Sequence, residues 1–546
     1  MTLVKNAGDQ VLDALVVGAG FAGLYALHKL RTQGLSVRVI EAAPELGGTW
    51  YYNRYPGARC DVESVDYCYS FSDELQQEWN WTEKYATQAE ILRYLNWFAD
   101  KLDLRGDITF NTRVVSAVLD ETTLRWTVTT DDGRVLSARF CVMATGPLSA
   151  AMTPDFRGLG TFAGEIYHTA AWPHDPVDFA GKRVAVIGTG SSGIQSIPIV
   201  AEQAAHLYVF QRTPNYSVPA GNKRLFPEEL ADIKASYPER RRVSWRSGGG
   251  SPHITAPKPT MEFTTAERRA AFETRWQLGG VLFSKTFPDQ MTDLEANEEA
   301  SKFYEEKVRA VIDDPAIADM LIPNDHPIGA KRICTDSNYF QTFNRPNVSL
   351  VSLRATPIES IDAAGINTTG FSKRKAHYDL DMIVLATGFD AMTGALSKID
   401  IVGRDGAILR DDWAHGPRTY LGLGVDGFPN LFLISGPGAP AMLANMVLHA
   451  EAQVNWVAEA ITYLDNHGYA AIEPALDSVD GWVAECARRA EATLFTKANS
   501  WYMGANVPGK PRGFMLFVGG FATYNDICAE VAHAGYKGFD LIKTSR

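Results

Sequence analysis

Two short glycine-rich loops have the spacing that binds phosphate groups. The first, "GAGFAG" from Gly18 to Gly23, follows a strand-like apolar run and precedes residues with helical spacing. In such a loop the first glycine permits a tight turn, the second lets a pyrophosphate approach the backbone, and the third lets the helix pack on the strand. Unpaired N–H groups at the start of the helix then face the phosphates. The pattern predicts a dinucleotide site that includes Gly18, Gly20, Phe21 and Gly23.

Glu41 adds weight to this prediction, since it ends the next strand-like run. A carboxylate at that point can accept hydrogen bonds from both ribose hydroxyls of a dinucleotide. A GxGxxG pattern alone is weak, and a glycine-rich turn with an ordinary strand-end charge is the alternative. The strand, the helix and the acid together favour dinucleotide binding.

The second loop, "GTGSSG" from Gly188 to Gly193, repeats the frame without the acid. The strand after it ends in Arg212 and Thr213 instead. A carboxylate would repel a 2′-phosphate, whereas a guanidinium can form charge-assisted hydrogen bonds with it. We therefore predict NADP rather than NAD at this loop, and a solvated strand-end arginine is the alternative. The predicted contacts are Thr189, Gly190, Ser191, Ser192, Gly193, Ile194, Gln195, Arg212 and Thr213.

Two dinucleotide sites on one chain imply that electrons pass between two cofactors. A flavin is the natural electron acceptor for NADPH, so we predict FAD in the first site and NADPH in the second. The six cysteines are scattered, with no CxxC pair and no zinc-like Cys/His spacing. Neither a disulfide reductase nor a metal site is therefore expected. O2 is the remaining electron acceptor, which favours a monooxygenase.

Parallel strands and helices must position these loops. Residues 13–42 have the pattern of strand, turn, helix and strand, and residues 181–214 repeat it. A strand-like run ending in Ala-Thr-Gly follows each unit, and charged segments with helical spacing lie between residues 225 and 325. The 546 residues exceed what one core supports. The predicted fold class is α/β, with two Rossmann-like dinucleotide-binding domains and a mainly helical insertion. The predicted boundaries are 1–148 and 392–546 for the FAD-binding domain, 149–220 and 330–391 for the NADP-binding domain, and 221–329 for the insertion.

Charge and hydropathy argue against some partners. The net charge of −12 disfavours nucleic acid. No apolar run approaches the ~20 residues of a membrane span, and the first residues lack the regions of a signal peptide. We therefore expect a cytoplasmic monomer that takes a small-molecule substrate, with neither nucleic acid nor membrane as a partner.

The polar connector between the two units has a specific set of side chains. Its sequence "FAGEIYHTAAWP" places Phe162, Gly164, His168, Trp172 and Pro173 at set intervals. This pattern resembles the fingerprint of type I Baeyer–Villiger monooxygenases, whereas other flavin monooxygenases usually lack the Trp-Pro ending. The stretches "GGTWYYNRYPGARCDVES", "FQRTPNYSVP", "GAKRI", "LATGFDAMTGAL" and "SWYMGANVPGKPR" resemble the same family in the same order. The resemblance spans about residues 12 to 540 and is greatest to the phenylacetone and steroid monooxygenase group, with cyclohexanone monooxygenase more distant.

The resemblance implies a definite reaction. In this family NADPH reduces FAD, O2 adds at the flavin C4a atom, and the resulting peroxyflavin attacks a ketone carbonyl to give an ester or lactone. The implied substrates are aryl or bulky cyclic ketones, steroids among them. Two alternatives stay open: a flavin monooxygenase that oxidises sulfur or nitrogen, and a non-catalytic NADP(H)-binding protein.

The resemblance also implies which residues carry the chemistry. Arg332 in "GAKRI" matches the catalytic arginine, and Asp61 matches the acid that orients it near the flavin. A guanidinium suits a site where a peroxide and an oxyanion develop, because it stays charged and offers several donors. Without the resemblance, Arg332 would be predicted as a surface or capping residue and Asp61 as a turn cap. Lys331 matches a lysine that joins Arg212 and Thr213 at the 2′-phosphate.

Further contacts are implied around the flavin, the nicotinamide and the ketone. Those toward FAD are Thr49, Trp50, Tyr51, Tyr52, Arg59, Cys60, Asp61, Tyr67, Val114 and Met446. Trp501 matches a residue that contacts the nicotinamide cofactor, although alone it would be predicted as core. The implied ketone pocket comprises Leu148, Ile333, Ala441, Met442 and Leu443, for which plain apolar packing is the alternative.

His168 has two interpretations. With a pKa near ~6.5 it could serve as a general base. A lone histidine in a connector is more often a hydrogen-bonding strut. We expect the fingerprint to hold the two nucleotide-binding domains in a fixed relation, with His168 in a structural role.

Overall fold

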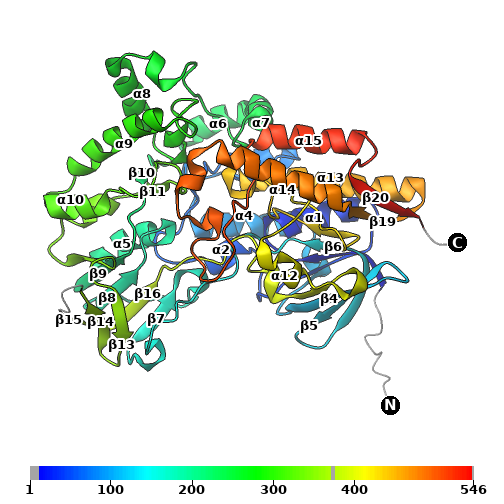
Figure 1. Cartoon of the computed structure of the whole chain (residues 1–546), viewed down its shortest axis with the longest axis horizontal. Helices are drawn as coiled ribbons and strands as arrows, with labels where there is room; N and C mark the ends of the chain where they lie inside the picture. Colours follow the sequence, from blue (N-terminus) through cyan, green and yellow to red (C-terminus); the bar gives the residue numbers. More distant parts are fainter. Residues whose placement is uncertain (1–10, 371–374, 544–546) are drawn as a thin grey trace.

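Two large β-sheets organise the described part of the chain (Figure 1). Each holds one glycine-rich loop after a strand inside the sheet, β1 in the first and β8 in the second. The computed structural model describes residues 11–370 and 375–543. Residues 1–10, 371–374 and 544–546, which belong to the predicted dinucleotide-binding domains, lie outside the described residues. The central strands of both sheets are parallel, so the predicted α/β fold class is confirmed.

The first sheet has eight strands in the order β17–β4–β5–β6–β1–β2–β3, with β18 paired to β6. The strands are β1 (Val11–Val17), β2 (Val37–Ile40), β3 (Ile108–Thr109), β4 (Val114–Asp120), β5 (Arg125–Thr130), β6 (Val135–Met143), β17 (Asp400–Val402) and β18 (Leu431–Leu433). β1 is buried on both faces, which explains why its sequence is a nearly continuous apolar run.

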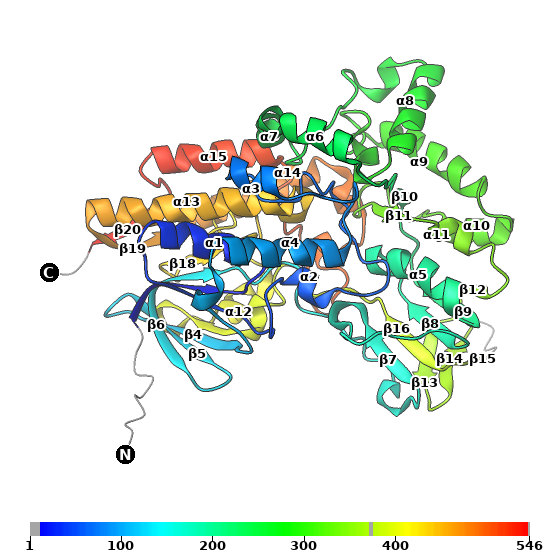
Figure 2. The ribbon, with the colours of Figure 1, turned by 180° about the vertical axis from the view of Figure 1, so that it is seen from behind.

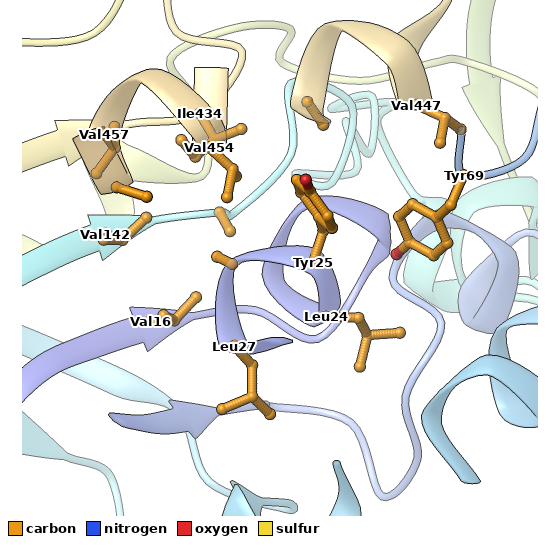
Figure 3. Close-up of a cluster of buried hydrophobic side chains, with 14 of the residues drawn as sticks. Val16, Leu24, Tyr25, Leu27, Tyr69, Val142, Ile434, Val447, Val454 and Val457 are labelled. Carbon is orange, nitrogen blue, oxygen red and sulfur yellow. The ribbon is translucent and has the colours of Figure 1, made fainter. Parts of the chain in front are cut away.

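Helices α1 (Phe21–Thr32) and α13 (Met446–His467) lie side by side over one face of this sheet (Figure 2). Figure 3 shows the apolar layer beneath them, with Val16 of β1, Val142 of β6 and Val454 of α13. The Tyr25 hydroxyl donates to Asn455 Oδ1 at 2.8 Å and so joins the two helices. This half of the molecule also contains α2 (Thr49–Tyr52), α3 (Asp73–Glu78), α4 (Gln88–Lys101), α12 (Leu409–Asp412), α14 (Leu476–Glu491), α15 (Phe521–His533) and the antiparallel pair of β19 (Tyr469–Pro474) with β20 (Phe539–Lys543).

The second sheet has five parallel strands in the order β12–β9–β8–β16–β7. They are β7 (Glu165–His168), β8 (Arg183–Ile187), β9 (His206–Gln211), β12 (Val348–Ser352) and β16 (Met382–Leu385). Helix α5 (Ser191–Gln203) packs on one face. The other face is covered by an antiparallel meander of β13 (Ile358–Ile361), β14 (Gly365–Thr369) and β15 (Lys375–Asp379). A short pair, β10 (Ser217–Pro219) with β11 (Cys334–Asp336), and α11 (Tyr339–Thr342) lie beyond α5.

The stretch 221–329 contains five helices that divide between the two cores. They are α6 (Pro227–Ala235), α7 (Tyr237–Arg246), α8 (Thr265–Leu278), α9 (Leu294–Arg309) and α10 (Pro315–Leu321). Tyr237 of α7 joins the core of the first sheet, where Arg240 pairs with Asp66 at 2.6 Å. Phe272 of α8 joins the core of the second sheet. The segment is therefore fastened to both halves of the molecule (Figure 2).

No helix in the described ranges is long and apolar enough to cross a membrane.

Candidate active site

The first glycine loop fits a dinucleotide pyrophosphate. Gly18 has a φ of +104°, and a Cβ there would lie 2.7 Å from the carbonyl oxygen of Ala144. A Cβ on Gly23 would lie 1.8 Å from the carbonyl oxygen of Gly18. Gly20 stands at the N-cap of α1 without a side-chain cap, so the first N–H groups of the helix remain available to an anion. The loop therefore needs its glycines and offers the donors that a phosphate requires.

The second loop repeats this geometry. Gly188 has a φ of +114°, and a Cβ there would lie 2.4 Å from the carbonyl oxygen of Ala386. A Cβ on Gly193 would lie 2.2 Å from the carbonyl oxygen of Gly188. Gly190, at the N-cap of α5, has no neighbour within 4 Å of its Cβ position. The space that the backbone approach of a pyrophosphate needs is thus present at this loop as well.

Each loop lies against an Ala-Thr-Gly segment. Ala144 follows β6 and Ala386 follows β16, and these are the strands beside β1 and β8. The carbonyl oxygens of the two alanines approach the first glycine of the corresponding loop. The repeat of Ala-Thr-Gly in the sequence therefore marks the strand that supports each loop, a role that sequence reasoning did not assign.

Glu41 lies at the first loop. Its carboxylate accepts hydrogen bonds from the backbone N–H of Ala19 at 2.6 Å and of Ala43 at 2.7 Å. Burial raises the pKa of Glu41, and these N–H donors partly offset the rise. Val114, predicted to contact the same cofactor, is buried in the same apolar cluster as Ile40, which precedes Glu41.

The predicted 2′-phosphate residues gather where β9 ends and where the chain approaches β11. The Thr189 hydroxyl donates to the carbonyl oxygen of Thr213 at 3.1 Å, which joins the glycine loop to the segment after β9. Burial lowers the pKa of Lys331, and the nearby charges of Arg212 and Arg354 lower it further, against the opposite effect of Asp325. Lys331 and Arg212 are therefore neighbours, although "GAKRI" is distant from Arg212 in the sequence.

Ile194 is the exception among the residues predicted at this loop. Its side chain is buried in the second core, and its N–H donates to the carbonyl oxygen of Gly190 at 2.9 Å. The side chain and the N–H are thus both engaged within the fold. The helical period explains this, because every third or fourth residue of α5 must pack on the sheet.

Arg332 is held by Asp61 and by a backbone carbonyl. Its Nε donates to Asp61 Oδ2 at 2.7 Å and its Nη2 to Asp61 Oδ1 at 2.8 Å, a bidentate pair. Its Nη1 donates to the carbonyl oxygen of Met442 at 2.6 Å. Burial alone would lower the pKa of Arg332, but the Asp61 carboxylate more than offsets this and the pKa is raised. The guanidinium is therefore a fixed, permanent positive charge.

An apolar cluster lies beside this guanidinium. Met442 is part of it, together with the predicted residues Leu148, Ala441, Leu443, Met446 and Trp501 and with the unpredicted Ala391, Met392, Tyr502, Phe514, Met515 and Leu516. Ile333, predicted to line the ketone pocket, is not in this cluster; it is 3% exposed and packs in the second core. The structure thus brings most of the predicted pocket residues together next to Arg332 and leaves Ile333 outside.

The predicted FAD contacts near residue 50 form an aromatic group. Thr49, Trp50, Tyr51 and Tyr52 make up α2. The Trp50 Nε1–H donates to the Tyr67 hydroxyl at 3.3 Å. Tyr67 also meets Phe21, the first residue of α1, edge to face at 5.2 Å. These side chains therefore continue directly from the first glycine loop.

Gln195 links the helix that follows the second glycine loop to the segment before Asp61. Its Nε2 donates to the carbonyl oxygen of Arg59 at 3.1 Å, and its Oε1 accepts from the Tyr55 hydroxyl at 2.8 Å. Cys60, the next residue, is buried, and the Arg59 side chain pairs with Glu83 at 2.7 Å. Gln195 thus fastens the start of α5 to the segment that ends in Asp61.

The fingerprint residues are committed to packing and hydrogen bonding. His168 Nδ1 accepts from the N–H of Ala170 at 3.0 Å, and its Nε2 lies 3.2 Å from both the Met152 carbonyl oxygen and Thr387 Oγ1. A Cβ on Gly164 would lie 2.3 Å from the carbonyl oxygen of Asp381. Phe162 and Trp172 are buried on opposite sides of the second sheet, and Pro173, directly after Trp172, is partly buried. Burial lowers the pKa of His168.

Two groups that lie near Arg332 were not predicted as site residues from the sequence. Burial raises the pKa of the Tyr502 hydroxyl to about 12, against the lowering effect of the Arg332 guanidinium. Lys285 lies against Gly249, and burial and the charge of Arg332 lower the pKa of its amine. Tyr502 follows the predicted Trp501 in the stretch "SWYMGANVPGKPR", so that motif could have identified it, whereas Lys285 carries no local motif.

Among the residues that the structure describes, no group of three or more His, Cys, Asp or Glu side chains could hold a metal ion.

The chain is similar in sequence to known flavin-binding monooxygenases. The family model described as "FMO-like: Flavin-binding monooxygenase-like" matches residues 13–231. The acetone monooxygenase (methyl acetate-forming) of Gordonia sp. (strain TY-5) is 44% identical over 532 residues, which cover 97% of this chain and 99% of that protein. A Baeyer–Villiger monooxygenase of Pseudooceanicola batsensis is 41% identical and is covered to 95%, with 96% of this chain aligned.

The fold matches solved structures at high similarity. A structure of an oxidised steroid monooxygenase bound to NADP is 63% identical, with a TM-score of 0.93. The alignment covers 98% of this chain and 100% of that one. The similarity therefore extends over both sheets, the helices between them and the cluster around Arg332.

Proposed function

The chain belongs to the flavin-binding Baeyer–Villiger monooxygenases, and on that premise we propose that it uses FAD, NADPH and O2 to convert aryl or bulky cyclic ketones, steroids among them, into esters or lactones. The reaction class follows from the family. The substrate range is the proposal, and it is supported by 63% identity to a steroid monooxygenase against 44% to an acetone monooxygenase.

The main support for this proposal is the environment of Arg332. Arg332 is locked by Asp61 and by the Met442 carbonyl oxygen at the border of an apolar cluster. A ketone is an apolar molecule with one polar oxygen, so it fits a pocket of apolar walls with one fixed cation. The residues present match the substrate class.

The two glycine loops match the two cofactors. The first loop continues into an aromatic group suited to a flavin, and the second lies beside the cations Arg212 and Lys331, which suit a 2′-phosphate. When bound, FAD that has been reduced by NADPH supplies the electrons with which one oxygen atom of O2 is inserted beside the carbonyl carbon.

The chain's own residues would position the ketone and stabilise the charge that develops on its oxygen. Arg332 would hold its charge at the ketone oxygen, where negative charge develops as the carbonyl carbon is attacked. It would not transfer a proton, because its pKa is raised above an already high value. Asp61 would fix the plane of the guanidinium, and the apolar cluster around Met442 would exclude water from the reacting atoms.

We further propose the domain assignment and the setting of the protein. The first sheet, with residues 1–148 and 392–546, would bind FAD. The second, with residues 149–220 and 330–391, would bind NADPH, and residues 221–329 would brace the two. All six cysteines are free and buried, which suits a reducing, cytoplasmic compartment, and we propose a monomer that meets only its ketone and O2.

A ketone panel tests the proposal. NADPH consumption and mass detection of the inserted oxygen would be compared for linear aryl ketones, small cyclic ketones and steroid side-chain ketones, with a thioether as a further substrate. Esters from aryl or steroid ketones support the proposal. Oxidation of the thioether alone would favour sulfur chemistry, and absence of NADPH-dependent oxygen uptake with every compound would favour a non-catalytic NADP(H)-binding protein.

A further inference from the structure

A cluster of charged side chains extends the 2′-phosphate site beyond the residues predicted from the sequence. Arg354 Nη2 donates to the Thr213 hydroxyl at 3.4 Å. Arg354 also forms an ion pair with Asp325, whose other oxygen lies 2.6 Å from His326 Nδ1. None of these three residues carries a recognisable motif.

Strand pairing explains why Arg354 reaches this position. β12 runs parallel to β9 with Ser352 opposite Gln211, and the N–H of Leu353 donates to the Gln211 carbonyl oxygen at 2.8 Å. Arg354 therefore leaves its strand at the level at which Thr213 leaves the neighbouring strand. Parallel strands bring such residues to the same edge of a sheet, which is where an α/β sheet binds its ligands.

The charges of the cluster match a phosphate monoester. Arg212, Lys331 and Arg354 supply three positive charges, and Asp325 supplies one negative charge. Each of the other three acts on the pKa of Lys331, so all three lie within electrostatic reach of its amine. The surplus of two positive charges balances a phosphate monoester, which carries about −1.5 to −2 at pH 7.

His326 orients the Asp325 carboxylate and adds no positive charge to the cluster. It is buried, and burial and the charge of Lys331 lower its pKa, against the opposing effect of Asp325. A neutral imidazole that donates from Nδ1 fixes Asp325 in orientation. Asp325 in turn holds the half-exposed guanidinium of Arg354 beside Thr213. Because Arg354 is already ordered, less side-chain entropy is lost when a ligand binds.

We propose that Arg354 binds the 2′-phosphate of NADP(H) together with Arg212, Thr213 and Lys331, and that Asp325 positions it for that contact. This inference rests on the NADPH assignment made above. It adds a specificity-determining residue to that site, since only the phosphate that distinguishes NADP from NAD would use it.

Calorimetry on the FAD-loaded enzyme tests the inference without turnover. Adenosine 2′,5′-bisphosphate and 5′-AMP would be titrated into the wild type, Arg354→Gln, Arg354→Lys and the control Arg345→Gln. Arg345 is an exposed arginine shortly before β12 begins, so it controls for loss of one surface charge near the same strand. Thermal unfolding would establish that each variant is folded.

The expected result is a Kd for the bisphosphate that rises about tenfold in Arg354→Gln, with the Kd for 5′-AMP unchanged. Arg354→Lys should recover part of the loss, and Arg345→Gln should match the wild type. Equal bisphosphate affinity in Arg354→Gln and wild type would overturn the inference, as would equal losses for both ligands. A wild type that does not prefer the bisphosphate over 5′-AMP would instead refute the NADPH assignment on which the inference rests.

Discussion

Arg332 and Asp61 face each other through two parallel hydrogen bonds of 2.7 and 2.8 Å, although one belongs to the segment after α10 and the other to the loop after α2. The first segment continues into β11, beside the second sheet, and the other follows α2 in the half that contains the first glycine loop. The pair therefore joins the two halves of the molecule at the point where their cofactors would meet.

Arg332→Ala should remove ester formation while NADPH still reduces the flavin. Removal of the fixed cation leaves the charge that develops on the ketone oxygen without its stabilising partner, which should lower product formation more than about a hundredfold. Product mass and anaerobic flavin bleaching would be measured on the same preparation. An Arg332→Ala enzyme that still forms ester at near the wild-type rate would refute the assigned role.

Arg212→Ala should raise the KM for NADPH about tenfold or more while that for NADH changes little, because a charge-assisted contact to the 2′-phosphate is lost. Steady-state kinetics with both cofactors decide the matter. If the two KM values rise together, Arg212 acts on the fold of the loop and the argument from the 2′-phosphate fails.

Gly190→Ala should leave stability unchanged and weaken NADP binding. Its φ is −84°, and its Cβ would meet no atom within 4 Å, so the folded chain tolerates the methyl group. The same methyl group would occupy the space through which a pyrophosphate approaches the backbone. Gly193→Ala is the contrasting variant, since its Cβ would lie 2.2 Å from a backbone oxygen and should lower the Tm as well. Undiminished NADP binding in a folded Gly190→Ala would contradict this placement of the cofactor.

His168→Ala should lower the Tm and leave kcat nearly unchanged. The imidazole Nδ1 accepts from the N–H of the buried Ala170, and its removal leaves that N–H without this acceptor. Its Nε2 also lies within hydrogen-bond distance of Met152 and Thr387, which bond to each other as well. Unfolding curves and turnover with a good ketone would be compared at saturating NADPH. A large loss of kcat in a variant as stable as the wild type would favour the general-base interpretation.

Local patterns made the fold predictable. A glycine turn, its flanking strand and its helix are adjacent in the sequence, so the geometry around Gly18 and Gly188 follows from steric rules that act within about thirty residues. The placement of Arg332 opposite Asp61 was accessible only through resemblance, because each residue alone is compatible with a surface role.

The positions of some site residues depend on tertiary packing and could not be predicted from the sequence. Arg354 and Lys285 reach their sites because strands or loops from distant segments meet there, and no spacing in the sequence records such a meeting. Ile333 shows the converse, since its neighbour Arg332 points to the site while Ile333 packs in the second core. Successive residues of an extended segment point in opposite directions, so proximity in sequence to a catalytic residue does not place a side chain in the pocket.

Glu451→Gln should reduce the dependence of stability on pH. Glu451 is buried on α13, where it accepts from the Ser70 N–H at 2.6 Å and also from the Ser70 hydroxyl, with Arg241 and Tyr25 nearby. Burial raises the pKa of Glu451 from 4.5 to about 7, against the lowering effects of Ser70 and Arg241.

The sign of the effect follows from proton counting. Between pH 4.5 and about 7 the folded chain keeps the Glu451 proton that the unfolded chain loses, so the free energy of unfolding falls as the pH rises through this window. The fall amounts to at most about 3 kcal/mol, and above the window it stays constant. An amide does not ionise, so the Tm of Glu451→Gln should fall less than that of the wild type between about pH 5 and about pH 8. Glu459→Gln, an exposed position on the same helix, is the control and should follow the wild type. Parallel Tm curves for Glu451→Gln and wild type would show that Glu451 does not titrate in this range.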